Sequence, residues 1–185
     1  PLPSMPLYFW GDRQNKRLRE SYFDTFPGVW KHGDWIEFTD YGGSVIYGRS
    51  DATINRRGLR LGSSEIYRAV ESLSEVVDSL VVDLEYLNRD SNMKLFVVLC
   101  TDIELSEDLK EKIRGVIKNA VSARFVPDEI IKIYEVPRTL SGKKLEVPVK
   151  KLLLGSDPKT VVNRDSMANP SSFEFFLNFA RHLSL

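Results

Sequence analysis

The sequence contains one cysteine, Cys100, and only two histidines among its 185 residues. A single thiol cannot form an internal disulfide, and one Cys with two His residues is too few for a Cys/His zinc site. No apolar run approaches the roughly 20 residues that a membrane-spanning helix requires. We therefore expect a protein of a reducing compartment, the cytosol, without a metal centre of its own and without membrane contact.

The sequence also has no excess of charge of either sign, since 26 basic residues balance 26 acidic ones. A neutral chain exerts no long-range attraction on nucleic acid or on an anionic membrane, so any basic site must be local. A nucleic-acid binder would have to use Arg56, Arg57, Arg60, Lys143 and Lys144, and no run of base-stacking aromatic residues accompanies them. We consider that function the weaker alternative.

The beginning of the chain lacks an initiator Met and carries no signal-peptide pattern, so we expect a piece of a longer protein. Residues 1–33 are rich in aromatic side chains, are interrupted by Pro27 and Gly28, and show no sustained periodicity. We interpret them as irregular chain that packs on a neighbouring domain. A strand–turn–strand hairpin follows, with its turn at Asp40-Tyr41-Gly42-Gly43.

From residue 48 the pattern is that of a compact α+β domain, a small mixed sheet flanked by helices. Ser63 and Ser106 precede apolar residues at helical spacing and predict two helix starts, whereas residues 48–62 read as exposed loop. Ser171-Ser172-Phe173-Glu174 predicts a capping box for a terminal amphipathic helix, after a polar, mobile stretch over 155–170. The other predicted elements are strands over 76–84, 94–100 and 129–136 and a short helix around Pro148.

Three short motifs could carry chemistry. The first is Gly33-Asp34, and the second is a Gly- and Arg-rich stretch from Gly48 to Tyr67, in which Arg49 and Arg60 could bind phosphate. The third is Pro137-Arg138-Thr139-Leu140-Ser141-Gly142-Lys143-Lys144, where Gly142 permits a tight turn that presents Lys143. It is no nucleotide-hydrolase P-loop, because the upstream Gly is lacking and Lys144 replaces the required Ser or Thr. Taken singly, each motif could equally be a solvated loop.

In this order the three motifs resemble those of the adenylate-forming acyl-CoA synthetase superfamily. Gly33-Asp34 resembles the end of a ribose-binding motif of the large domain, Gly48–Tyr67 resembles the hinge motif, and Pro137–Lys143 resembles the motif of the C-terminal lysine. Further segments, among them Pro3–Trp10 and Ser141–Lys150, are similar to the branch that activates acetoacetate. The resemblance implies a two-step ligase that first joins the acid to AMP and then transfers it to coenzyme A.

The resemblance also implies a division of the chain and a role for seven residues. Residues 1–48 would end the large adenylation domain, 49–55 would be the hinge, 56–155 the mobile C-terminal domain, and 156–185 a tail. The implied roles are ribose binding for Asp34 and Arg49, phosphate binding for Arg60, adenylation for Lys143, the hinge for Asp51, passage of pantetheine for Gly58, and coenzyme A phosphate binding for Lys118.

ATP with Mg²⁺ and coenzyme A would be substrates of the parent enzyme, and no tightly bound cofactor or nucleic acid is expected. The glycine-rich ATP loop and the acyl pocket of the superfamily are absent from this sequence, so the chain alone should be inactive without the missing N-terminal domain. Two alternatives remain open at this point. One is a synthetase for another short-chain acid, and the other is a non-catalytic module that binds phosphate or coenzyme A.

Overall fold

The computed structural model describes residues 5–50, 53–56, 59–85 and 90–183. The chain divides into two compact units, Pro1–Asp34 and Trp35–Leu185, and each is described by itself. Hinge residue Asp51 and Gly58 of the sequence analysis lie outside the described residues.

The first unit contains helix α1 (Lys16–Tyr22), preceded by the 3-10 turn η1 (Arg13–Asn15). Asp12 caps this helix, because its two carboxylate oxygens accept the backbone N–H groups of Arg17 and Leu18, each at 2.9 Å. Tyr22 stacks on Trp30 with ring centroids 3.9 Å apart. The expectation of irregular chain over 1–33 was therefore wrong for residues 16–22. These residues have only a weak helical pattern in the sequence, and the carboxylate of Asp12 supports the helix by accepting N–H groups of its first turn.

The second unit begins with a hairpin of β1 (Asp34–Phe38) and β2 (Ser44–Arg49), as the sequence predicted. The turn is closed by Thr39, whose N–H donates to the carbonyl of Gly43 at 2.9 Å and whose hydroxyl accepts the Gly43 N–H at 3.1 Å. Gly42 has a φ of +77°, which a residue with a side chain rarely adopts.

A second hairpin occupies the stretch that the sequence analysis took for an exposed loop. Strands β3 (Ile54–Arg56) and β4 (Leu59–Leu61) pair antiparallel, with Asn55 opposite Arg60. Ile54 is 3% exposed and belongs to the hydrophobic core, and Arg56 donates to the carbonyl of Val126 at 3.2 Å. The expectation failed because one buried isoleucine among many polar residues gives no periodic pattern.

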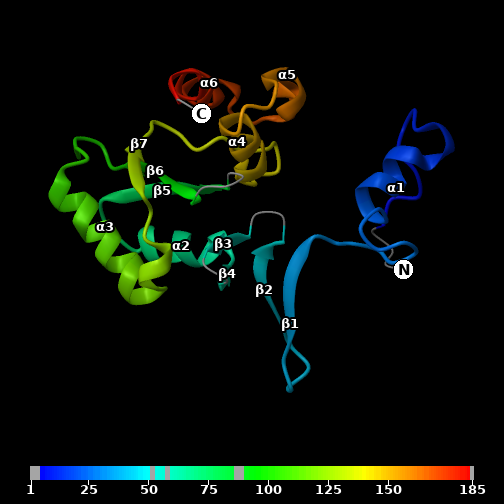
Figure 1. Cartoon of the computed structure of the whole chain (residues 1–185), viewed down its shortest axis with the longest axis horizontal. Helices are drawn as coiled ribbons and strands as arrows, with labels where there is room; N and C mark the ends of the chain where they lie inside the picture. Colours follow the sequence, from blue (N-terminus) through cyan, green and yellow to red (C-terminus); the bar gives the residue numbers. More distant parts are fainter. Residues whose placement is uncertain (1–4, 51–52, 57–58, 86–89, 184–185) are drawn as a thin grey trace. The chain divides into compact units, whose positions relative to one another are not determined.

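The central sheet of the second unit has the order β5-β6-β7 (Figure 1). Strands β5 (Val76–Leu84) and β6 (Asn92–Leu99) are antiparallel, whereas β7 (Glu129–Lys132) is parallel to β6, so the sheet is mixed as predicted. The third strand is shorter than expected and ends before Ile133.

Each face of this sheet carries its own hydrophobic core. On one face α2 (Ser63–Val70) and α3 (Glu107–Ala120) cover Val81, Leu95 and Val97, and on the other α4 (Glu146–Leu153) and α6 (Phe173–His182) cover Leu80, Val82 and Phe96. Figure 1 shows the two pairs of helices on opposite sides of β5 and β6. Successive side chains of β5 point to opposite faces, and residues 79–84 are all buried because helices cover both faces of the sheet.

The segment after α4 is ordered and contributes to the second core. It contains the short helix α5 (Pro158–Val161) and the 3-10 turns η3 (Arg164–Ser166) and η4 (Pro170–Ser172), and Met167 is 4% exposed. The predicted capping box does not form, because the start of α6 has no side-chain cap hydrogen bond, Glu174 pairs with Arg164 at 2.6 Å, and the hydroxyl of Ser172 donates to the Asn169 carbonyl at 2.6 Å. Helix α6 nevertheless packs on the body of the unit, with the rings of Phe176 and Phe96 4.9 Å apart.

Candidate functional site

The third sequence motif forms a three-residue β-hairpin turn at the edge of the second unit. The N–H of Gly142 donates to the Thr139 carbonyl at 2.8 Å, and the N–H of Thr139 donates to the Lys143 carbonyl at 2.9 Å. The Lys143 N–H in turn donates to the hydroxyl of Thr139 at 3.1 Å. Gly142 has a φ of +82°, as the last residue of such a turn requires. The turn thereby holds Lys143 at its exit.

The side chain of Lys143 is exposed, and its ammonium group forms no ion pair or hydrogen bond with any residue that the structure describes. The lysine side chain carries a compact charge at the end of four flexible carbons. An exposed lysine at a fixed backbone position can therefore reach an anion anywhere within the length of its side chain. The geometry fits a cation that is kept available for a ligand.

Lys144, the next residue, has the opposite surroundings. Its ammonium group lies 2.7 Å from Glu71 Oε1, 2.8 Å from Asp78 Oδ1 and 2.7 Å from the carbonyl of Ser79. It also lies 3.9 Å from the centre of the Tyr67 ring, in cation–π geometry. The second lysine of the pair therefore anchors the turn to α2 and β5.

Arg138 anchors the other leg of the same turn. Its Nη2 donates to Asp78 Oδ2 at 2.6 Å and its Nη1 donates to the carbonyl of Gly142 at 2.7 Å. Burial acts to raise the pKa of Asp78, but hydrogen bonds from Lys144 and Arg138 outweigh it and hold the pKa below its usual value. Asp78 is consequently a carboxylate at neutral pH.

A second polar cluster lies on the inner side of Lys144. The hydroxyl of Tyr67 donates to Glu146 Oε1 at 2.8 Å and accepts the N–H of Val81 at 3.2 Å, while the hydroxyl of Ser63 donates to both carboxylate oxygens of Glu146. Burial, with the neighbouring charge of Glu146, raises the pKa of Tyr67 well above its usual value. These contacts join the start of α2 to the start of α4.

The outer edge of the turn is held by the segment after α5. Thr139 forms an antiparallel β-bridge with Met167, and the N–H of Leu140 donates to the Ser166 carbonyl at 3.0 Å. Asn169 accepts the N–H of Arg138 at 2.9 Å and donates to the carbonyl of Val136 at 2.9 Å. The turn that carries Lys143 is thus fixed on both sides.

The remaining predicted site residues lie on other elements. Asp34, the last residue of the first unit, is the first residue of β1, and its Oδ2 lies 2.6 Å from Nδ1 of His32. Arg49 ends β2, and Arg60 is exposed at the centre of β4. Lys118 is exposed in the last turn of α3, at the end of a helix where a cation is favoured.

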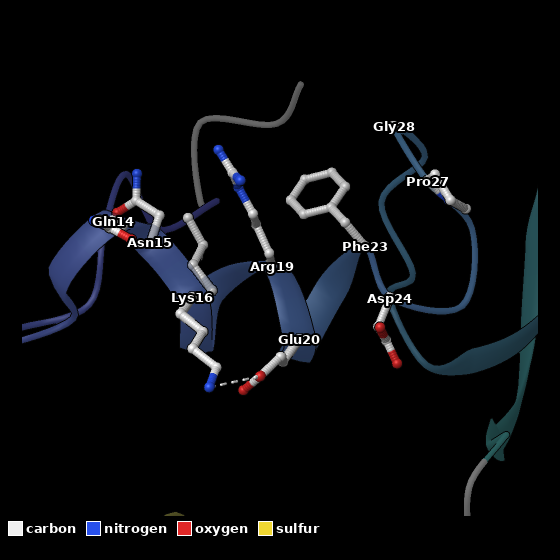
Figure 2. A pocket seen from close by; sticks show the side chains of 10 residues that line it. Gln14, Asn15, Lys16, Arg19, Glu20, Phe23, Asp24, Pro27 and Gly28 are labelled. Atoms are coloured by element: carbon white, nitrogen blue, oxygen red, sulfur yellow. Dashed lines mark ion pairs between the residues drawn. The ribbon is translucent and has the colours of Figure 1, made fainter.

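The first unit also has a pocket of about 700 Å³ (Figure 2). Figure 2 shows it between α1 and the chain from Phe23 to Gly28, with charged side chains of both signs in its wall, including the ion pair of Lys16 and Glu20 at 3.8 Å. None of the predicted site residues lines this pocket. Its balanced charges select no particular ligand.

No helix in the part of the chain that the structure describes is long and apolar enough to span a membrane. Within the same residues no group of three or more His, Cys, Asp or Glu side chains is placed to hold a metal ion.

Comparison with known proteins connects this arrangement to a family, although no family model matches the chain. The acetoacetyl-CoA synthetase of Danio rerio is 42% identical over 179 residues, which are 96% of this chain and 26% of that protein. The acetoacetyl-coenzyme A synthetase of Rhizobium meliloti is 42% identical over 175 residues, 95% of this chain and 26% of that protein. The chain is a homologue of part of acetoacetyl-CoA synthetase. It spans about a quarter of the length of these relatives, and their identity confirms the predicted resemblance.

Solved structures agree with the sequence relatives. The acetoacetyl-CoA synthetase from Streptomyces lividans is 46% identical, with a TM-score of 0.88 over 98% of this chain and 27% of that one. The ATP-bound RpMatB-BxBclM chimera B1 is only 21% identical, with a TM-score of 0.64 over 77% of this chain, and shows the fold alone. The small mixed sheet flanked by helices is thus the fold of the C-terminal domain of adenylate-forming enzymes, as predicted.

Sequence reasoning found Lys143 but not the residues that hold it. Asp78 lies 60 residues before Arg138, within a mostly apolar strand whose two acidic residues, Asp78 and Asp83, carry no local sign of a partner in the turn. Asn169 is likewise far from the motif in sequence. The only available signal was the position of Arg138 and Lys144 on either side of the turn, which suggests paired cations that need a counter-charge.

Proposed function

We propose that the complete protein containing this chain is an acid–thiol ligase that converts acetoacetate, ATP and coenzyme A to acetoacetyl-CoA, AMP and diphosphate. The proposal is supported by identity above 40% to acetoacetyl-CoA synthetases along nearly the whole chain. The structural observation that carries it is the exposed ammonium group of Lys143, which has no partner among the described residues and lies on a turn held from both sides.

The first half-reaction would place Lys143 between two anions. A carboxylate oxygen of the acid attacks the α-phosphorus of ATP, diphosphate leaves, and the acyl-adenylate forms. Both reactants are negatively charged, and a preorganised cation stabilises the charge that builds on the transferring oxygens. Magnesium would enter with ATP as part of that substrate.

In the second half-reaction the thiol sulfur of coenzyme A attacks the acyl carbon of the adenylate, its proton is lost, and AMP leaves. We propose that residues 56–155 rotate about a hinge at 49–55, with Asp51 as its pivot. The rotation would replace the groups that serve adenylation in the active site by those that serve thioester formation. In this scheme residues 1–48 are the C-terminal end of the large adenylation domain, and residues 156–185 form a tail that supports the turn that carries Lys143.

The other assigned residues would bind the nucleotide and coenzyme A. Asp34 and Arg49 would bind the ribose of the nucleotide and Arg60 its phosphate, because a guanidinium is permanently charged and matches phosphate geometry. Gly58 would leave room for the pantetheine arm, and Lys118 would meet the nucleotide phosphate of coenzyme A as a point charge. We place the protein in the cytosol, which fits a sequence with a single thiol.

The proposal is tested by acid-dependent ATP–diphosphate exchange with the complete protein. Acetoacetate is compared with acetate, butyrate and 3-hydroxybutyrate, and we expect acetoacetate to give the highest kcat/KM. A preference for another short acid would assign the protein to a different branch of the superfamily. Binding of coenzyme A without exchange for any acid would contradict catalysis and favour a non-catalytic coenzyme-binding module.

A further inference from the structure

The turn that carries Lys143 (residues 139–143, called the lysine turn) is flanked by two chain segments, its legs, which begin at Arg138 and Lys144. These two legs are joined through one carboxylate. Arg138 and Lys144 are direct partners in an antiparallel β-bridge at the base of the turn. Their side chains reach the two oxygens of Asp78 on β5, Arg138 at 2.6 Å from Oδ2 and Lys144 at 2.8 Å from Oδ1. A single acidic side chain therefore ties together the chain before and after Lys143.

We propose that Asp78 is the positioning residue of Lys143: by holding Arg138 and Lys144 it fixes the backbone from which the Lys143 side chain extends toward the transferring phosphate. The inference rests on the proposed function, because it assigns Asp78 a part in adenylation. Asp78 acts through its neighbours and touches no substrate in this scheme.

The link from Asp78 to Lys143 runs through one peptide bond. Arg138 uses one nitrogen for Asp78 and another for the carbonyl of Gly142, which belongs to the peptide group that includes the Lys143 N–H. That N–H is held at the same time by the hydroxyl of Thr139. The orientation of this peptide sets the direction of the Lys143 Cα–Cβ bond, so a guanidinium that is itself fixed also fixes the lysine.

Asp78 is well placed to serve as the fixed point. Its side chain is 18% exposed, the register of β5 against β6 shifts next to it, and Oδ1 also accepts the N–H of Ser79 at 2.9 Å. Half-burial strengthens its charge-assisted hydrogen bonds relative to those of an exposed pair.

Loss of the carboxylate would affect the two legs unequally. Lys144 would keep Glu71 and the Ser79 carbonyl, whereas Arg138 would keep only the Gly142 carbonyl among the described contacts of its guanidinium. The leg that contacts the Gly142 peptide would therefore be the one released. This asymmetry separates a positioning role from general support of the fold.

The test is a double-mutant cycle in the complete protein, with Asp78→Ala, Lys143→Ala and both together. We measure ATP–diphosphate exchange, thioester formation from supplied acetoacetyl-AMP, and the unfolding midpoint of each variant. Asp78→Ala should lower kcat of exchange about 10- to 100-fold, since misplacement of a catalytic group by about 1 Å has an effect of this size. The KM for ATP and the thioester rate should change by no more than about twofold, as expected for a group that acts only in adenylation.

Non-additivity is the decisive readout. In the Lys143→Ala background, Asp78→Ala should lower exchange by less than about twofold further, because residues that act through one another are not additive. Asp78→Asn, which keeps a neutral acceptor for Arg138, should lose less than Asp78→Ala. Equal losses from Asp78→Ala in both backgrounds would overturn the inference.

Glu75→Ala is the matched control. Glu75 is also a half-buried carboxylate, with a side chain 24% exposed and Oε1 2.5 Å from Lys112 on α3, but it has no contact with the turn. It should lower the unfolding midpoint without lowering exchange. If Glu75→Ala and Asp78→Ala reduce exchange to the same extent, Asp78 has only a structural role.

Two further measurements keep the inference testable if a variant misfolds or the function is wrong. Arg138→Lys keeps the charge but cannot reach both acceptors, and it should reproduce the loss of exchange. The amide hydrogens of Gly142 and Lys143 should exchange with solvent faster in Asp78→Ala and at an unchanged rate in Glu75→Ala. An unchanged rate of amide hydrogen exchange in both variants would overturn the inference. A wild-type protein without acid-dependent diphosphate exchange, or a fully active Lys143→Ala variant, would instead refute the proposed function.

Discussion

Lys143 and Lys144 are adjacent in the sequence and opposite in their surroundings. The ammonium group of Lys144 contacts Glu71, Asp78 and the ring of Tyr67, whereas that of Lys143 has no partner among the residues that the structure describes. Antiparallel pairing at the base of the turn places Lys144 on the face toward β5. One lysine therefore fixes the position of the turn, and the other remains available for chemistry.

Lys143→Ala in the complete protein should lower adenylation roughly 10²-fold or more and largely spare thioester formation. A positioned charge of this kind contributes about 3 kcal/mol to transition-state stabilisation, or roughly a 10²-fold rate difference. ATP–diphosphate exchange and thioester formation from preformed acetoacetyl-AMP are measured on the same preparation. Equal loss of both half-reactions would give Lys143 a different role, and no loss in either would leave it an exposed turn residue.

Lys144→Ala is the companion variant, and it should reduce stability where Lys143→Ala does not. Removal of Lys144 leaves the half-buried Asp78 and the more exposed Glu71 without one of their counter-charges, which costs about 1–3 kcal/mol of unfolding free energy. Urea unfolding of the 185-residue chain measures both variants. Equal stability of the two variants would contradict the assignment of an anchoring role to Lys144.

Asp51→Pro should separate the two half-reactions of the complete protein. Proline fixes φ near −65° and also restricts Ser50 before it, so a residue that must change its backbone angles between two working states would be locked in one. We expect adenylation to persist and thioester formation to fail. Loss of both activities in a cooperatively folded protein would show that Asp51 is no hinge, and unchanged activities would show a passive linker.

The stability of the chain should depend on pH through Asp78. Its pKa in the folded chain is below the usual value of 3.8, so the unfolded chain binds more protons in acid and stability rises with pH across this range. The contribution is fully present above pH values near 3.8 and is lost as the pH falls through the lower, folded value. The difference in unfolding free energy between wild type and Asp78→Asn should therefore be largest near neutrality and shrink in acid.

Urea unfolding at a series of pH values from neutral to acidic checks this expectation. The exposed Asp165 provides the control, and Asp165→Asn should change stability by no more than about 0.5 kcal/mol at any pH. A difference between wild type and Asp78→Asn that stays constant with pH would contradict the lowered pKa of Asp78.

Phe176→Ala should destabilise the second unit strongly. Phe176 is fully buried against Phe96, and truncation of a buried phenylalanine costs about 3–5 kcal/mol through lost burial and the cavity left behind. Tyr134→Ala is the control, since the ring of Tyr134 is 95% exposed. A small effect of Phe176→Ala on the unfolding free energy would mean that α6 does not belong to the core.

The sequence was sufficient where local pattern and packing agree. Ser106 precedes an amphipathic helix, and its hydroxyl accepts the Leu109 N–H at 3.2 Å, as a cap should. The apolar strands predicted over 76–84 and 94–100, observed over 76–84 and 92–99, were recognisable because both faces of the sheet are covered, which makes a continuous apolar run necessary. The position of Lys143 was recognisable from Gly142 and the motif around it.

The sequence was insufficient where stability comes from distant partners. The β3–β4 hairpin depends on Arg56, whose contacts lie 70 and 72 residues away in the sequence. The support of the lysine turn comes from β5 on one side and from Asn169 on the other, and no local pattern reports such contacts. The capping box failed because a 3-10 turn at Pro170–Ser172 already brings the Ser172 hydroxyl to the Asn169 carbonyl.

The bracing of the turn by Ser166, Met167 and Asn169 has a consequence for synthesis of the chain. Residues 138–144 emerge from the ribosome before the segment that completes their hydrogen bonds, so the nascent turn lacks its outer edge. Phe96 is likewise left without its aromatic partners until α6 is made. A product of premature termination between Gly155 and Ser166 would therefore expose apolar surface of β6 to chaperones and proteases, and the turn that carries Lys143 would never gain its outer support.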